Sequence, residues 1–136
     1  MRNHTPQFLP MSASTNWHLG TMGFGYKQWL GPFYPAGMAP KNFLAHYSTL
    51  FDAVEIDSTF YGSPRAELVQ RWYQKTPDNF TFCLKTPKAI THEARLTKGV
   101  EAMHTFVETA VLLRKKLGCI LIQFGPDFTY AQAEDL

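Results

Sequence analysis

Hydrophobic positions follow two alternating spacings along most of the chain. Short apolar runs typical of buried strands occupy 17–22, 53–58, 80–85 and 119–124. Between them, apolar residues recur every three or four positions, which predicts three helices with one apolar side each. A regular order of strand and helix implies a parallel sheet with right-handed crossovers. The pattern therefore predicts an α/β fold.

The helix boundaries follow from residues that start and stop helices. Pro40 begins the first helix, and Ser63-Pro64 supplies an N-cap followed by proline in the first turn of the second. The third helix runs over 99–117, with the cations at 114–116 favouring its C-terminal dipole. Gly118 is predicted to be its left-handed cap.

Alternation along each strand separates the side chains into two faces. The apolar face, expected against the helices, comprises Val54, Ile56, Ser58, Phe82, Leu84, Ile120, Ile122 and Phe124. The opposite face comprises Glu55, Asp57, Thr59, Cys83, Lys85, Cys119, Leu121 and Gln123. An open doubly wound sheet would be apolar on both faces, because helices cover both. One face that becomes polar toward the strand ends instead favours part of a (β/α)₈ barrel, with about four parallel βα units.

Polar inner residues near the carboxyl ends of barrel strands are candidates for chemistry, since active sites of barrel enzymes lie at that mouth. We expect Glu55, Asp57 and Lys85 to be the catalytic residues. Paired carboxylates can act as general acid and base, and Lys85 can bind an anion or polarise a carbonyl. The alternative is structural, with Lys85 neutralising Glu55 or Asp57 inside the barrel.

A second group is expected to line the substrate cleft. Aromatic residues make up 15% of the chain and gather near predicted strand ends and loops, which suits a ligand cleft and a filled core equally well. The expected substrate-binding residues are Tyr26, Trp29, Thr59, Tyr61, His92 and Gln123. We predict no metal ligands and leave the cofactor unknown.

Net charge, cysteine placement and apolar run length indicate the cellular compartment and the classes of binding partner. A net charge of +2 is too small to indicate a nucleic-acid surface by itself. Cys83 and Cys119 lie in strand-like runs without metal-ligand spacing, which favours buried reduced thiols in a cytoplasmic protein over a disulfide. No apolar run approaches the length of a membrane helix. We expect residues 1–16 to be a disordered leader and 17–136 to form the barrel half.

Four segments together resemble the YecE-like family, domain of unknown function 72. They are Gly20-Thr21-Met22-Gly23-Phe24 with Tyr26, Trp29 and Gly31-Pro32-Phe33-Tyr34-Pro35; Val54-Glu55-Ile56-Asp57-Ser58-Thr59-Phe60-Tyr61 with Pro64; 80–85 with Pro87 and Ile90-Thr91-His92; and Leu121-Ile122-Gln123-Phe124 with Pro126 and Phe128. The resemblance implies a complete (β/α)₈ barrel, distantly similar to metal-binding endonuclease barrels. The family's activity is not established.

The chain departs from the family pattern in two places and in length. Met22-Gly23-Phe24 replaces the usual Ser-Gly-Trp, and Asp57 stands where Asn is common. A typical barrel needs roughly 250 residues, whereas this chain has 136 and ends after its fourth predicted strand. We interpret it as truncated, with two halves pairing to close a barrel as the alternative.

Three functions remain open from the sequence. The first is an enzyme acting on a small polar or phosphorylated substrate at the barrel mouth. The second is a nucleic-acid binder or phosphodiesterase, which the basic positions Lys85, Lys88, His92, Arg95 and Lys98 would serve by contacting phosphates. The third is an inactive truncated fragment. No phosphate-binding loop, nucleophile elbow, dinucleotide fingerprint or zinc spacing fixes a reaction.

Overall fold

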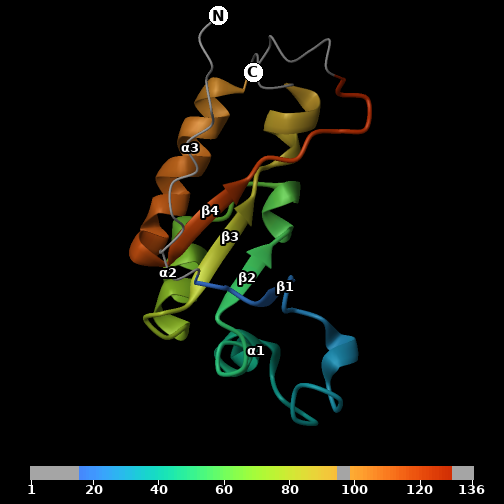
Figure 1. Cartoon of the computed structure of the whole chain (residues 1–136), viewed down its shortest axis with the longest axis vertical. Coiled ribbons are helices and arrows are strands. Elements are labelled where there is room, and N and C mark those ends of the chain that lie inside the picture. The colour runs from blue at the N-terminus through green and yellow to red at the C-terminus, as the bar shows by residue number, and fades with distance from the viewer. Residues whose placement is uncertain (1–15, 95–98, 130–136) are drawn as a thin grey trace, which may run out of the picture.

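The computed structural model describes residues 16–94 and 99–129, which form one four-stranded sheet with helices on one side (Figure 1). The strands are β1 (Gly20–Met22), β2 (Ala53–Ile56), β3 (Thr81–Lys85) and β4 (Leu117–Leu121). The α-helices are α1 (Phe43–Tyr47), α2 (Ala66–Lys75) and α3 (Val100–Ala110). Short 3-10 or π segments are η1 (Lys27–Trp29), η2 (Pro40–Asn42), η3 (Ser58–Tyr61), η4 (Ala89–Glu93) and η5 (Val111–Lys116).

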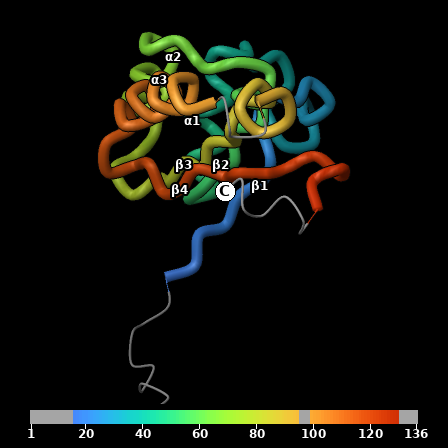
Figure 2. Tube along the Cα trace, turned by 90° about the horizontal axis from the view of Figure 1, so that it is seen from above, coloured from blue at the N-terminus to red at the C-terminus, as the bar shows by residue number. Residues whose placement is uncertain are grey.

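The strands lie side by side in the order β1-β2-β3-β4, and every pairing is parallel. This arrangement confirms the predicted α/β class and the four parallel strands, with one α-helix after each of the first three. Among the described residues, the sheet is not closed. Seen along the sheet, α1, α2 and α3 all lie on the same side of it (Figure 2).

The core lies between the sheet and these helices. Val54, Ile56, Phe82 and Leu84 on the strands are buried, as strand alternation predicts. They pack in one cluster with buried helix and loop residues, among them Tyr34, Phe43, Leu44, Tyr47, Val69, Trp72, Phe106, Ala110 and Leu113. Within the described residues, no helix is long and apolar enough to cross a bilayer.

Two helices begin or end differently from the sequence prediction. The apolar stripe that starts after Pro40 forms a 3-10 turn and then the short α1, so Leu50 is exposed beyond the helix. Helix α2 begins at Ala66, and its N-cap is Arg65, without a side-chain hydrogen bond. The predicted Ser63 cap is therefore wrong, because the chain is still extended at Arg65.

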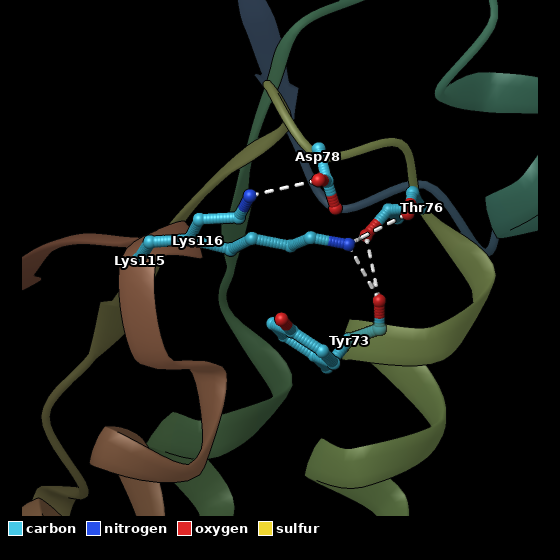
Figure 3. Close-up of polar contacts among 5 residues, drawn as sticks. All are labelled: Tyr73, Thr76, Asp78, Lys115 and Lys116. Carbon is cyan, nitrogen blue, oxygen red and sulfur yellow. Dashed lines mark hydrogen bonds and ion pairs between the residues drawn. The ribbon is translucent and has the colours of Figure 1, made fainter.

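The predicted helix over 99–117 is the largest error. Helix α3 ends at Ala110, η5 follows, and Arg114 has φ 50° and ψ −126°. This turn brings the ammonium group of Lys116 to the C-terminal end of α2 (Figure 3). There Nζ donates to the carbonyl oxygens of Tyr73 and Thr76, each at 2.6 Å, and to the Thr76 hydroxyl at 3.2 Å.

Gly118 is a strand residue rather than the predicted left-handed cap. A Cβ atom at Gly118 would lie 2.3 Å from Cγ2 of Thr81, so a larger residue would force the Thr81 side chain to move, and glycine lets β3 and β4 pair without that shift. The register between these strands shifts at this point, from Phe82 opposite Leu117 to Cys83 opposite Cys119. Strand β4 consequently begins and ends earlier than the predicted 119–124, and Ile122 is exposed beyond it.

Candidate functional site

The uncovered face of the sheet carries a row of side chains from all four strands. Met22 pairs with Glu55, Glu55 with Cys83, and Cys83 with Cys119. These residues line an open hollow of about 720 Å³ together with the N-terminal halves of the strands. Glu55 therefore lies on the inner face, as predicted, but in the middle of the sheet rather than at its carboxyl edge.

The two cysteines face each other across β3 and β4 as free thiols. Burial, and then a hydrogen bond with Cys119, raise the pKa of the Cys83 thiol to about 12. The prediction that both are buried is wrong, because Cys83 is half-buried and Cys119 is exposed. The reason is that no helix or strand of the described residues covers this face of the sheet.

Asp57 lies at the carboxyl edge, immediately after β2. Its backbone has turned to helical angles, φ −81° and ψ −22°, so strand alternation ends at Ile56. The residue lines a small pocket of about 240 Å³ with Gly23, Tyr26 and Ser58. Gly23 has φ 76°, and a Cβ atom there would come within 2.8 Å of the Tyr26 hydroxyl and 3.3 Å of Asp57 Oδ1. Tyr26 and Asp57 thus meet across a position that admits only glycine.

Tyr26 and Trp29 belong to the loop that follows β1. The Tyr26 hydroxyl donates to the carbonyl oxygen of Met22 at 2.6 Å, and its ring lies 4.9 Å from that of Trp29. Trp29 also contacts Phe33 and Tyr34, and it is partly buried against the core. Trp29 therefore supports Tyr26 from behind, and Tyr26 is the residue that reaches the pocket of Asp57.

Lys85 ends β3 and lies beside an aromatic ring. Its Nζ is 4.9 Å from the centre of the Phe60 ring, and the His92 ring approaches the same ring at 5.1 Å, edge to face. The Nδ1 atom of His92 lies 2.8 Å from the hydroxyl of Thr91, which is buried. Phe60, which follows β2, therefore contacts two nitrogen-bearing side chains that both belong to the segment from the end of β3 to η4, at the carboxyl edge.

Within residues 16–94 and 99–129, no ion pair joins Lys85 to Glu55, Asp57 or any other carboxylate, and no hydrogen-bond acceptor lies within reach of its Nζ. The interpretation of Lys85 as a neutralising partner of Glu55 or Asp57 therefore finds no contact to support it. An ammonium group with unused donors at a strand end is suited to bind an anion.

The sequence predicts that Thr59 lines the substrate cleft, whereas in the structure its hydroxyl is buried between two backbone carbonyl groups. The side chain is 2% exposed, and Oγ1 lies 2.7 Å from the carbonyl oxygen of Ile56 and 2.6 Å from that of Lys85. This contact joins η3 to the end of β3. It holds Phe60, the next residue, beside the Lys85 side chain.

The remaining expected binding residues lie at the outer rim. Tyr61 is 80% exposed and packs edge to face on Phe60 at 5.5 Å. Gln123 is exposed, two residues beyond β4. Neither touches Asp57 or Lys85 through a contact between described residues.

Sequence reasoning missed the segment after β4 that approaches His92. Gly125 is buried, and a Cβ atom there would lie 3.1 Å from Cδ2 of His92 and 2.7 Å from Oδ1 of Asp127. The Gly125-Pro126 pair, which signals a tight turn after a strand, was the only sequence cue to this approach.

The basic loop after β3 is only partly described. Lys88 Nζ forms an ion pair with Glu93 Oε1 at 3.6 Å, which offsets one positive charge of this loop. Arg95 and Lys98 lie outside the described residues, so the predicted phosphate-contacting set stays a prediction. Among the described residues, no group of three or more His, Cys, Asp or Glu side chains is placed to hold a metal ion.

The model of the family "Protein of unknown function DUF72" matches residues 18–136. The UPF0759 protein YecE of Escherichia coli K12 is 34% identical over 87 residues, which are 61% of this chain and 32% of YecE. The UPF0759 protein YunF of Bacillus subtilis is 28% identical over 117 residues, 82% of this chain and 40% of YunF. The chain thus spans less than half the length of these relatives.

Two solved structures have the same fold over 87% of the chain. A DUF72 family protein from Thermotoga maritima superposes with a TM-score of 0.72 at 29% identity, and the match covers 48% of that protein. A DUF72 family protein from Enterococcus faecalis gives a TM-score of 0.69 at 26% identity, and the match covers 44% of it.

Proposed function

Because the chain belongs to the DUF72 family, whose description names no activity, we propose from its own site that it acts as an enzyme on a small polar or phosphorylated substrate. The substrate binds at the carboxyl edge of the sheet. The observation that carries this proposal is the ammonium group of Lys85, which lies 4.9 Å from the Phe60 ring centre and has no carboxylate or carbonyl partner among the described residues.

Lys85 and His92 form the anion-binding part of the proposed site. Both contact Phe60, and in this proposal a phosphate or carboxylate group at the same edge accepts hydrogen bonds from Lys85 Nζ and from the His92 ring. Tyr61, which packs edge to face on Phe60, supplies an aromatic wall in this proposal. Tyr26 and Gln123 are assigned to the rim of the cleft, where ligand sites use a small number of polar groups for specificity.

Asp57 and Glu55 are the proposed acid–base residues. Asp57 reaches the edge pocket beside Tyr26, whereas Glu55 lies one inner-facing position below Lys85 in strand register. General acid–base catalysis requires the group to lie within hydrogen-bond reach of the transferred proton. We assign proton transfer to Asp57 for a substrate at the carboxyl edge, and to Glu55 for a substrate that enters the hollow.

Phosphate binding tests the proposal directly. Titration of the ¹⁵N-labelled chain with inorganic phosphate is expected to shift the amide signals of Lys85, Phe60 and His92 in a saturable way. Lys85→Met keeps the side-chain stem against Phe60 and removes the charge, and we expect it to weaken binding by about tenfold or more. Lys115→Met is the matched control, because Lys115 pairs with Asp78 near the opposite end of the sheet.

An equal loss in both variants, or no saturable shift in the unaltered chain, would contradict the proposal. Tighter binding of a single-stranded oligonucleotide than of phosphate, with a steep salt dependence, would favour the nucleic-acid alternative instead. Turnover of a panel of phosphorylated sugars that Asp57→Asn or Glu55→Gln abolishes, without loss of folding, would identify the acid–base residue. A chain that folds and turns over none of them would favour the inactive fragment.

The location proposed with this function is the cytoplasm. The two facing thiols, Cys83 and Cys119, are free, which supports a reducing compartment.

A further inference from the structure

Two opposite charges lie at the ends of neighbouring strands and do not pair with each other. Ile56 on β2 is the register partner of Leu84 on β3, and the two strands are parallel. Asp57 and Lys85 are therefore the next residues along adjacent strands, at the carboxyl edge (Figure 1). The Thr59 hydroxyl contacts the carbonyl oxygens of Ile56 and Lys85, which holds the two strand ends together. Among the described residues, no ion pair joins Asp57 to Lys85.

Each of these charges lies beside an aromatic side chain instead. Lys85 Nζ is 4.9 Å from the centre of the Phe60 ring. Asp57 lines the pocket of about 240 Å³ with Tyr26, and no hydrogen bond or ion pair reaches its carboxylate from another described residue. A carboxylate and an ammonium group with unused hydrogen-bonding capacity are both available to a ligand. Their proximity favours a ligand that carries both signs of charge.

The pocket beside Asp57 is suited to a cation. Among the described residues, no Lys, Arg or His side chain lines it, and its oxygen-bearing side chains are Tyr26, Asp57 and Ser58. The Tyr26 hydroxyl donates its proton to the carbonyl oxygen of Met22 at 2.6 Å, so toward a ligand its oxygen acts as an acceptor. A protonated amine has three donors and no acceptor, and it therefore matches this set of groups.

The number of carboxylates in the pocket favours an amine over a resident metal ion. Asp57 is the only carboxylate among the described residues that line the pocket. Calcium takes six to eight oxygen ligands, and within the described part of the chain no group of three or more His, Cys, Asp or Glu side chains is placed to hold a metal ion. A single carboxylate is enough for an ammonium group, because one charge neutralises the other.

We propose that the substrate of this site carries a protonated amine beside its anionic group, with the phosphate or carboxylate at Lys85 and the amine at Asp57. The anionic half of this inference rests on the function proposed above, and the amine goes beyond it. Aminoalkyl phosphates, amino-sugar phosphates and amino acids belong to this substrate class. The two opposite charges also fix the orientation of the ligand, because the reversed orientation would bring like charges together.

Matched pairs of ligands test for the amine. We compare 2-aminoethyl and 3-aminopropyl phosphate with 2-hydroxyethyl and 3-hydroxypropyl phosphate by calorimetry at neutral pH, where an aliphatic amine is protonated. EDTA is present so that no metal ion bridges the phosphate to Asp57. At least one amine is expected to bind about tenfold more tightly than its hydroxyl counterpart. Equal affinities within both pairs would overturn this inference and leave the proposed phosphate site intact.

Asp57→Asn removes the charge that binds the amine and keeps the size of the side chain. We expect the preference for the amine to fall to about twofold or less, while the affinity for inorganic phosphate changes little. Asp78→Asn is the matched control, because Asp78 pairs with Lys115 near the opposite end of the sheet, and it should keep the full preference. A preference that survives in Asp57→Asn, or that Asp78→Asn removes equally, would overturn the inference.

Lys85→Met separates this inference from the function on which it rests. It is expected to weaken the amino and hydroxyl phosphates by the same factor, because both present the same anionic group to Lys85. A loss confined to the amino phosphates would contradict the assignment of the anion to Lys85 and of the amine to Asp57. If neither inorganic phosphate nor any of the four probes binds the unaltered chain, the proposed function fails and this inference fails with it.

Discussion

The two ends of the sheet each hold a lysine beside an aromatic ring, and the two lysines have different surroundings. At the amino end, Lys116 is 2% exposed, and its Nζ lies 4.4 Å from the centre of the Tyr73 ring and donates to three oxygen atoms. At the carboxyl edge, Lys85 lies against Phe60 but has no acceptor among the described residues. The same residue type thus stabilises the fold where its donors are used and is available to a ligand where they are not.

The amino-end lysine replaces a conventional cap of α2. The carbonyl groups of Tyr73 and Thr76 belong to the last turn and end of that helix, where backbone acceptors lack partners. A cation there also interacts favourably with the helix dipole. Lys116 is almost fully buried, and this burial lowers the pKa of its ammonium group.

Lys116→Met is expected to have the largest effect on stability. It leaves two carbonyl groups and the Thr76 hydroxyl without this donor in a buried position, which should lower the free energy of unfolding by about 3 kcal/mol. Urea unfolding followed by circular dichroism measures the change. If Lys116→Met lowers the free energy of unfolding by no more than the same change at the exposed Lys115, α2 does not depend on this contact.

The pH dependence of unfolding checks the same residue. Because burial lowers the pKa of Lys116 in the folded state, the folded chain releases this proton before the unfolded chain as pH rises. The unfolded state then binds more protons, so this group makes stability rise as the pH approaches the ordinary lysine pKa. The difference between the unaltered chain and Lys116→Met should follow that direction across alkaline pH.

Thr59→Val tests whether the carboxyl edge also contains a structural contact. The substitution keeps the shape and removes the hydroxyl that joins Ile56 and Lys85, which should cost about 1–2 kcal/mol. The matched control is Thr105→Val, whose exposed hydroxyl bonds the carbonyl of Glu101 within α3 and should matter less. Equal costs in the two variants would show that Thr59 is not special to the edge.

Arg114→Gly is expected to stabilise the amino end. At φ 50° and ψ −126° the backbone of Arg114 favours glycine, and relief of that conformation should add about 1 kcal/mol. Part of the gain is offset by the contact of the guanidinium with the Tyr73 ring, 5.6 Å away. Arg114→Ala removes the contact and keeps the strained backbone, so it should only destabilise.

Lys85→Met should have the smallest effect on stability, about 0.5 kcal/mol, because only the contact between the cation and Phe60 is lost. Thermal unfolding beside Lys116→Met makes the comparison between the two ends quantitative. A loss as large as that of Lys116→Met would mean that Lys85 is a structural residue, and the proposed ligand site would fail.

The sequence predicted the faces of the sheet better than the ends of its elements. Alternation placed Val54, Ile56, Phe82 and Leu84 correctly, because it is a property of every strand. It failed after Ile56, where one change of backbone angles at Asp57 turned Thr59 from the expected cleft into the interior. Such a change depends on a partner from another strand, the Lys85 carbonyl, which no local pattern contains.

The same limit explains the errors around β4. The cations at 114–116 were predicted to interact with the C-terminal end of the helix that contains them. Lys116 instead donates to Thr76 at the end of α2, 40 residues earlier in the chain. A glycine after a helical pattern predicts a helix cap. The contact that favours glycine at position 118 is with Thr81, and it forms only when β3 and β4 pair. For the site, residue types and strand ends indicated Lys85 and Asp57, whereas the shared contact of Lys85 and His92 with Phe60 required the fold.

The strand order has a consequence for how the chain folds. From β2 onward, each strand pairs with the strand before it in sequence, so each pairing waits only for the crossover between two successive strands. The paired positions are nevertheless 28 residues apart for Ala53 with Thr81 and 36 apart for Cys83 with Cys119. Parallel pairing over such a separation forms slowly, because the loop must close before the contacts stabilise it.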